Sequence, residues 1–469
     1  MGKKERSLKK MKVKRILSVA LCAAIAASMA GCSKETAGGD VTTITVWTGN
    51  GGDKAFITKE IENWNNTTGK EKGIRIDYTV QEGSIGEKLD LAFSSGKAPD
   101  IFQGGTLAQL VANDQVAAYE DLPGGDALVK KFEKYIEEDM NRINGKTYML
   151  PVSVTTYGLI YNKDMFKAAG IVDENGEAKP PETLAEMVED AKKLTNPDKK
   201  EYGMIFPVKF GAWYDLDVTK VATATDGLPV GYNPATGQFD FSGQAEVMKA
   251  IMQIKADGSY FPGADGIDND TARSRFALGG IGMKTAGSYD YGVLTDQFPA
   301  KIDWGVAPFP SADRNEKHLQ FMNSGSFYKI NKSSVETIGA EKLMTVMEWF
   351  CSDELIKKYY ENGLQLPIDF DMVSDVKLGD DMENWKAFAE MTKISRQFVM
   401  PRLFDVSGQK DLAQTWLEDI WTGNIPADQI DEVCREKADM MNKGIEKYQE
   451  LHPDYDGQKY ILPEWNTKR

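Results

Sequence analysis

The chain has 469 residues, with 71 Asp and Glu against 56 Lys and Arg, so its formal net charge is −15. Such an acidic body repels nucleic acid and anionic membrane surfaces. Its two histidines argue against multi-histidine metal sites and histidine-based triads, and its length predicts two domains rather than one core.

The N-terminus has the layout of an export signal. Eight basic residues and a single acid occupy the first fifteen positions, and an apolar stretch, Ile16 to Ala30, follows. This stretch is shorter than the roughly 20 apolar residues of a membrane-spanning helix. It ends in Met29-Ala30-Gly31-Cys32, which resembles a lipobox.

We therefore expect residues 1–31 to be a lipoprotein signal peptide, Cys32 to carry the lipid, and residues 32–42 to form a polar tether. An ordinary secretory signal is the alternative, and Met11 is an alternative start. Removal of residues 1–31 changes the formal net charge from −15 to −22. The lipid, and no basic patch, would then hold the protein at the extracytoplasmic face of the cell membrane.

The next part of the chain alternates strands and helices. Residues 43–47 are β-branched and aromatic, 49–53 form a Gly-rich break, and apolar residues then recur at helical spacing. Residues 74–80 alternate as a strand, a helix follows from Ile85, and a third strand is expected at 100–102. This βαβαβ order predicts an α/β sheet.

Residues 145–166 are typical of an extended crossing between lobes, and a capping box of Thr183 and Glu186 predicts the start of a helix. Asp265, Asp268 and Asp270 miss the calcium-loop spacing, so we expect a loop in which Asp270 or Thr271 starts a helix. Further helices are expected at 244–256, 271–278, 334–351, 353–362, 383–397, 409–421 and 427–450. Further strands are expected near 204–208, 281–284, 302–306 and 325–330.

Of four cysteines, two fall in the signal and lipobox, which leaves Cys351 and Cys434 in helix-like sequence without metal-ligand spacing. We expect two buried thiols, with a disulfide as the alternative. No Pro/Gly linker divides the chain, which predicts that the lobes are built from discontinuous segments.

Five segments, in order and spacing, resemble the family 1 extracellular solute-binding proteins, the substrate-capturing lipoproteins of ABC sugar importers, whose members include maltose-binding proteins. They are ITVWTGNGGDKAF; GKAPDIF; GKTYMLPVSVTTYGLIYNKDMFKAAGI with PPETLAEM; FALGGIGMKTAGSYDYGVL with IDWGVAPFP; and FMNSGSFYKINKSS through MEWFCSDELIKKYYENGLQLPI.

The resemblance implies a two-lobe periplasmic-binding-protein-like fold of type II, with discontinuous lobes joined by hinge crossings. Lobe 1 would comprise 43–154 and 322–367, and lobe 2 would comprise 155–321 and 368–469. Candidate hinges are 154–157, 311–322 and 366–368. The protein would be a monomer without a cofactor that closes on a mono- or oligosaccharide and delivers it to ABC permease subunits.

A sugar presents hydroxyls at its edges and C–H patches on its faces, so its site combines aromatic platforms with planar hydrogen-bonding groups. The resemblance places Tyr289 at a sugar-stacking position where Trp is common, and Trp213 at a similar site. Core packing is the alternative for any one aromatic, and we favour it for Trp304. The candidate platforms are Trp47, Trp213, Tyr214, Tyr289, Tyr291 and Trp304.

The turn after the first strand offers Asn50, Asp53 and Lys54 to ligand hydroxyls, as a maltose-binding member of the family uses an equivalent Asp-Lys pair. The alternative is that Asp53 only caps the next helix. The glycines of this turn do not complete a dinucleotide fingerprint, so we expect no nucleotide site.

Other candidate contacts follow from strand ends and from the resemblance. Gln103 and Gly104 follow the third strand, and the carboxyl ends of strands face the ligand in α/β sheets. Thr155 stands where a maltose-binding member has an acidic contact, which puts maltose itself in doubt. Tyr157, Asn323 and Arg402 complete the set, with a surface salt bridge as the alternative for Arg402.

Two other function classes are compatible with this sequence. Paired carboxylates could serve an exported carbohydrate-active hydrolase, although nothing singles out one pair among the 71 acids. An adhesive or structural lipoprotein would need no ligand site. A non-sugar solute is the alternative ligand for a binding protein.

Overall fold

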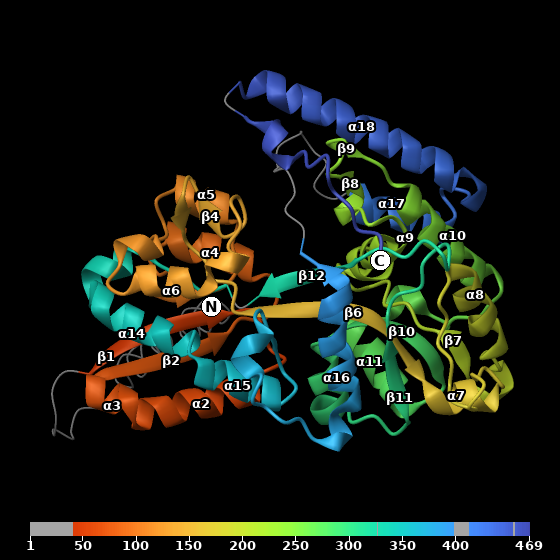
Figure 1. Cartoon of the computed structure of the whole chain (residues 1–469), viewed down its shortest axis with the longest axis horizontal. Coiled ribbons are helices and arrows are strands. Elements are labelled where there is room, and N and C mark those ends of the chain that lie inside the picture. The colour runs from red at the N-terminus through yellow and green to blue at the C-terminus, as the bar shows by residue number, and fades with distance from the viewer. Residues whose placement is uncertain (1–40, 326, 398–411, 454) are drawn as a thin grey trace, which may run out of the picture.

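Figure 1 shows the computed structural model of the chain, which describes residues 41–325, 327–397, 412–453 and 455–469. Two α/β lobes stand next to each other, and the long strand β6, Ser153–Asn162, runs from one lobe into the other. Within the described residues, no helix has both the length and the apolar character needed to cross a bilayer.

Lobe 1 is built on a four-stranded sheet in the order β13-β3-β1-β2. β1 pairs in parallel with both β2 and β3, whereas β13 returns from much later in the chain and pairs antiparallel with β3. This return makes the lobe discontinuous. The strands are β1 (Thr42–Thr48), β2 (Ile74–Val80), β3 (Ile101–Phe102) and β13 (Lys329–Ile330).

Lobe 2 is built around β6, which is the centre of a sheet in the order β15-β12-β6-β10-β7, with β11 and β14 also paired to β6. Val154 pairs with Ser324 of β12 and with Leu366 of β14, so three crossings meet at the start of β6. The other strands are β7 (Tyr202–Met204), β10 (Ile281–Gly287), β11 (Trp304–Ala307), β12 (Gln320–Gly325), β14 (Leu366–Pro367) and β15 (Ser395–Arg396).

Helices cover both sheets. Apolar residues at helical spacing, Ile57, Ile61 and Trp64, bury one face of α2, and α8 begins at the expected capping box of Thr183 and Glu186. Lobe 1 carries α2 (Lys54–Asn66), α3 (Thr68–Lys72), α4 (Ile85–Ser94), α5 (Leu107–Ala112), α6 (Gly125–Phe132), α13 (Lys332–Ser334), α14 (Ala340–Phe350), α15 (Asp353–Glu361) and the hairpin β4 (Arg142–Ile143) and β5 (Lys146–Thr147).

Lobe 2 holds the remaining helices, of which α16 lies against β6. Gly203 of β7 allows a close approach of α8, since a Cβ there would lie 2.1 Å from the Ala191 carbonyl oxygen. These elements are α7 (Lys163–Ala168), α8 (Leu184–Lys193), α9 (Lys220–Asp226), α10 (Ser242–Ala256), α11 (Asn269–Leu278), α12 (Asp290–Gly292), α16 (Glu383–Glu390), α17 (Leu412–Thr422), α18 (Ile430–Leu451), β8 (Tyr232–Asn233) and β9 (Gln238–Phe239).

The structure corrects three expectations about elements. The helix expected at 383–397 ends at Glu390, because residues 395–396 pair with β12 instead. The strand expected at 325–330 is divided into the end of β12 and β13, which belong to different sheets. Asp268, and not Asp270 or Thr271, caps α11 by accepting a hydrogen bond from the Thr271 backbone N–H at 2.8 Å.

Cys351 and Cys434 are free, buried thiols, as expected. The lobe boundaries given above stay predictions.

Candidate functional site

Strand β6 presents different residues to its two sides. The Thr156 hydroxyl donates to the Phe388 carbonyl of α16 at 2.8 Å. Tyr157 points the other way, because side chains alternate along a strand, and its ring meets Lys220 of α9. Asn323 of β12, which lies opposite Thr155 in the sheet, donates its amide to the Tyr157 hydroxyl at 2.9 Å. Tyr157, Thr155 and Asn323 thus lie together on the side of β6 that faces away from α16.

The buried Lys220 side chain contacts the Tyr157 ring. Lys220 is buried, and its Nζ lies 4.0 Å from the ring centre of Phe321 and 5.0 Å from that of Tyr157. Its ion pair is with Asp215, at 3.0 Å. Burial lowers the pKa of Lys220, and the Asp215 carboxylate opposes that shift. Asp215 opens a π-helical turn, Asp215–Thr219, a distortion that is frequent at functional sites.

Tyr289 follows β10, and charged neighbours hold its ring beside Tyr157. The residue is 36% exposed, and its ring meets the Tyr157 ring edge-on, with centroids 6.4 Å apart. The Arg273 guanidinium carbon lies 5.5 Å from the centre of the Tyr289 ring. Arg273 in turn donates through Nε to Asp290 at 2.5 Å, and Asp290 accepts from the Gly287 backbone N–H at 2.9 Å. This bracing leaves an oriented aromatic surface that a ligand can use.

Two buried ionisable residues, Lys284 and Asp217, are connected through Thr285 of β10. Lys284 donates to the Thr285 carbonyl at 2.8 Å, and Asp217 accepts from the Thr285 hydroxyl at 2.7 Å. Burial raises the pKa of Asp217 to about 6, and burial lowers the pKa of Lys284. These groups are enclosed, so they do not offer themselves to a ligand.

We call Tyr157, Tyr289, Asn323, Lys220 and Asp215 the aromatic wall.

In lobe 1, the predicted residues gather where β1 and β3 end. The Thr48 hydroxyl donates to Oε1 of Gln103 at 2.6 Å and accepts from the Asn50 backbone N–H at 3.0 Å. Gly104 has a φ of 87°, where a side chain is strained, and a Cβ there would lie 2.7 Å from Ile85. Asn50 and Lys54 are exposed.

Asp53 faces the junction between the lobes. It is 5% exposed. Its Oδ2 accepts a hydrogen bond at 2.8 Å from the side-chain amide of Gln365, the residue just before β14. It stands at the N-cap of α2 without a side-chain capping bond, so the structure does not bear out the alternative in which its side chain caps this helix. Burial raises its pKa, while hydrogen bonds from Gln365 and Tyr359 lower it.

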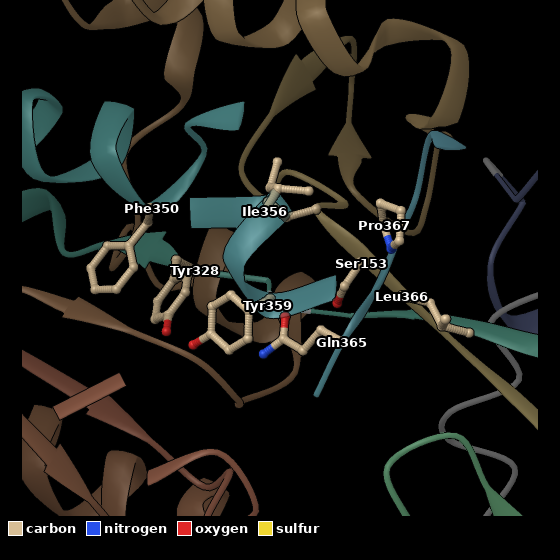
Figure 2. A pocket seen from close by; sticks show the side chains of 9 residues that line it. Ser153, Tyr328, Phe350, Ile356, Tyr359, Gln365, Leu366 and Pro367 are labelled. Carbon is tan, nitrogen blue, oxygen red and sulfur yellow. The ribbon is translucent and has the colours of Figure 1, made fainter. Parts of the chain in front are cut away.

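Figure 2 shows Gln365 and Tyr359 beside a pocket at the start of β6, next to Ser153 and Tyr328. The pocket volume is about 20 Å³. That space suits about one water molecule and is too small for a sugar. Asp53 therefore belongs to this junction, which couples α2 to β14.

Two predicted platforms lie in the core of lobe 2. Trp213 is 0% exposed, with its ring centre 5.7 Å from that of Trp421, and Tyr214 is buried with its hydroxyl bonded to Gln244. Both rings pack against α17, since the Tyr214 ring centre lies 6.2 Å from that of Trp416 and Trp421 belongs to the same helix. In this conformation neither ring offers a face to a ligand.

The other predicted residues are placed as follows. Trp47 is partly buried against the small cluster that contains Phe102 and Leu107. Tyr291 and Trp304 are buried, as favoured for Trp304. Arg402 and Cys32 lie outside the described residues.

Four residues around the two tyrosines were not predicted from the sequence: Lys220, Asp215, Phe321 and Arg273. One signal was present for the first of these: Lys220 interrupts an apolar helical stretch, VTKVATA, and a lysine there indicates a buried charge that needs a partner. The other three are brought to the wall by pairing and packing between distant segments.

Comparison with known proteins places the chain in a family. The family model for bacterial extracellular solute-binding proteins matches residues 64–391. A maltotriose-binding protein of Pyrococcus abyssi is 23% identical over 314 residues, covering 64% of this chain and 61% of that protein. An sn-glycerol-3-phosphate-binding periplasmic protein of Brucella abortus is 26% identical over 294 residues, covering 55% and 63%.

The fold has solved counterparts. The GacH receptor of Streptomyces glaucescens, whose structure was solved unliganded and with acarbose, superimposes with a TM-score of 0.65 at 16% identity, covering 88% of this chain and 99% of that one. That likeness shows the two-lobe fold. The segment matched by the family model, residues 64–391, covers more than half of the chain. The protein therefore belongs to the family of bacterial extracellular solute-binding proteins.

Proposed function

We propose that the protein is the substrate-binding lipoprotein of an ABC importer and that it captures a neutral carbohydrate between its two lobes. The observation that carries this proposal is the aromatic wall: Tyr289 presents a braced, partly exposed ring beside the amide of Asn323 and the hydroxyl of Tyr157. A ring face suits the C–H patches of a sugar, and the amide suits its hydroxyl edges.

The charges on the wall favour a neutral ligand over a phosphate. Lys220 is paired with Asp215, and Arg273 with Asp290 and Asp270. On the described part of lobe 2, both cations next to the two tyrosines are therefore already neutralised. At this wall a phosphate would face Asp215 while Lys220 and Arg273 are already paired, which is unfavourable at short range.

Capture would work by population shift. The open and closed arrangements of the lobes would interconvert at the junction of β6, β12 and β14, and a ligand that touches both lobes would stabilise the closed one. On lobe 1, Asn50, Lys54, Gln103 and Gly104 are the proposed partners. Closure without turnover agrees with a family of binding proteins.

The lipid anchor is a separate part of the proposal. The family relative that is named periplasmic and the lipobox-like sequence before Cys32 both support export. Replacing Cys32 by Ala should release a folded, ligand-competent protein into the medium. A protein that stays with the membrane after this change would show that the anchor lies elsewhere.

The main experiment measures binding by calorimetry on residues 32–469 with Cys32→Ala. The panel contains neutral oligosaccharides, a uronate and glycerol 3-phosphate. We expect a neutral sugar to bind, and Tyr289→Ala to weaken it at least 10-fold, which corresponds to about 1.4 kcal/mol. The matched control is Tyr202→Ala, a partly buried tyrosine on the far edge strand β7.

Three outcomes would contradict the proposal. Preference for glycerol 3-phosphate would refute the neutral ligand, and equal affinity of the Tyr289→Ala and Tyr202→Ala variants would remove the aromatic wall from the site. Release of reducing ends from a bound oligosaccharide would favour the hydrolase.

A further inference from the structure

A loop of lobe 1 reaches the C-terminal segment of lobe 2. The loop is Glu137–Met140, and it is fixed by the Asp139 backbone N–H, which donates to the Arg142 carbonyl at 2.8 Å. Asp139 has a φ of 65°, an uncommon conformation outside glycine that occurs in clamps and ligand sites. The strand residue Arg142 is held by Glu133 at 2.8 Å, so the loop belongs firmly to lobe 1.

The partner is the 3₁₀ turn Gly457–Tyr460, which is built into lobe 2. The Tyr460 ring is buried in the lobe 2 core, and its backbone carbonyl accepts from the Tyr232 hydroxyl at 3.3 Å. Two residues later, the Leu462 backbone N–H donates to the Pro234 carbonyl at 2.7 Å. The turn therefore moves with lobe 2.

Two side chains of this turn converge on one carboxylate of lobe 1. The Tyr460 hydroxyl donates to Oδ2 of Asp139 at 2.5 Å, and Lys459 forms an ion pair with the same oxygen. Nearby, burial raises the pKa of Glu137 in the same loop, and the Arg396 guanidinium of β15 opposes that shift. We call Asp139, Lys459 and Tyr460 the interlobe latch.

The latch lies on the same side of the junction as the aromatic wall. Figure 1 shows β4, β8 and α18 on one side of β6, whereas α16 extends past the other side. Tyr157 points away from α16, toward α9. The latch thus joins the lobes on the side of β6 that carries the wall (Figure 1).

We infer that the interlobe latch sets ligand affinity from outside the binding site, by stabilising the closed arrangement; this inference rests on the proposed function. Hydrogen bonds to a carboxylate are among the stronger ones, because one partner is charged. A contact that exists only when the lobes are close adds its free energy to that of the ligand. Residues that never touch the sugar would then determine how tightly it binds.

The test uses a matched pair of tyrosine variants. Tyr460→Phe removes the latch hydroxyl and keeps the buried ring. Tyr455→Phe is the control, because the Tyr455 hydroxyl has no hydrogen-bond partner among the described residues and its ring packs in the same aromatic group. Lys459→Met, at a partly exposed side chain, provides a second latch variant that leaves the core intact.

The distance between the lobes is measured first, without ligand. Spin labels are attached at Leu91→Cys on α4 and Glu174→Cys on lobe 2, both at exposed positions. The native thiols should not interfere, because both are buried and burial raises the pKa of Cys351 and of Cys434 to about 12. Tyr460→Phe should shift the distance distribution toward longer separations, whereas Tyr455→Phe should not.

Affinity is measured second, with the neutral oligosaccharide found by the panel. Tyr460→Phe and Lys459→Met should each weaken binding about 5- to 20-fold. Asp139→Asn combined with Tyr460→Phe should weaken it by less than the product of the single effects, because both remove one contact. Unchanged distances in Tyr460→Phe and Lys459→Met would overturn the latch. Absence of any sugar binding would refute the proposed function, and the ligand-free distances would still decide the latch.

Discussion

Lys329 lies inside lobe 1 and makes one long hydrogen bond, to the Phe327 carbonyl at 3.4 Å. It is 2% exposed, and its Nζ lies 5.7 Å from the ring centre of Phe102. Burial lowers its pKa from 10.5 to about 7. No carboxylate among the described residues pairs with it at ion-pair distance. Burial therefore destabilises the charged form of Lys329 in the folded protein.

The size of that penalty follows from the shift in pKa. A shift of this extent corresponds to about 5 kcal/mol, at about 1.4 kcal/mol for each unit. Since the folded pKa lies below the unfolded one, the unfolded chain binds more protons between pH 7 and 10.5, and stability should rise with pH across that window. Lys329→Met should remove this rise and stabilise the protein at pH 7 by on the order of 1 to 4 kcal/mol.

The assay is urea denaturation at pH 6, 7, 8 and 9. Lys332→Met is the control, since Lys332 is exposed and pairs with Asp114 on the surface. We expect the control to follow the wild type within about 1 kcal/mol at every pH. If Lys329→Met destabilises the protein at all four values, or keeps the same rise with pH, then Lys329 has a counter-charge and the reasoning is refuted.

Three further predictions concern stability and the placement of residues. Burial raises the pKa of Asp226 to about 7, so the folded chain binds the extra proton and stability should fall as pH rises from about 4 to 7; Asp226→Asn should flatten that fall in thermal melts. Trp213→Ala should cost about 3 to 5 kcal/mol in urea denaturation while the folded fraction keeps its sugar affinity; lost affinity at full stability would return Trp213 to the site. Gly203→Ala should lower the melting temperature strongly because its Cβ meets the Ala191 backbone, and an unchanged melting temperature would show that β7 and α8 separate easily.

The elements of the fold could be predicted where one segment carries its own pattern. The alternation of 74–80 and the Thr183–Glu186 box predicted β2 and the start of α8 because both are local signals. The split between β12 and β13 could not be predicted, because it depends on which sheet each half joins. The helix expected at 383–397 was shortened for the same reason, by pairing with β12.

The site was harder to predict than the fold. Tyr289 is partly exposed beside Tyr157 and stays a predicted platform, whereas Trp213 is buried against Trp421 of α17, a contact between distant segments. Asp53 has a carboxylate that could bind ligand hydroxyls. That carboxylate instead accepts a hydrogen bond from Gln365, more than 300 positions later in the chain. Burial and partners of this kind are set by tertiary contacts, which single-sequence patterns do not encode.

The most direct test of carbohydrate capture between the lobes is a crystal structure of the protein with the tightest-binding neutral oligosaccharide. We expect one sugar ring within van der Waals contact of Tyr289, hydrogen bonds from Asn323, and at least one contact from lobe 1 at Asn50 or Gln103. A sugar bound on an outer face, or held by one lobe without closure, would contradict the account.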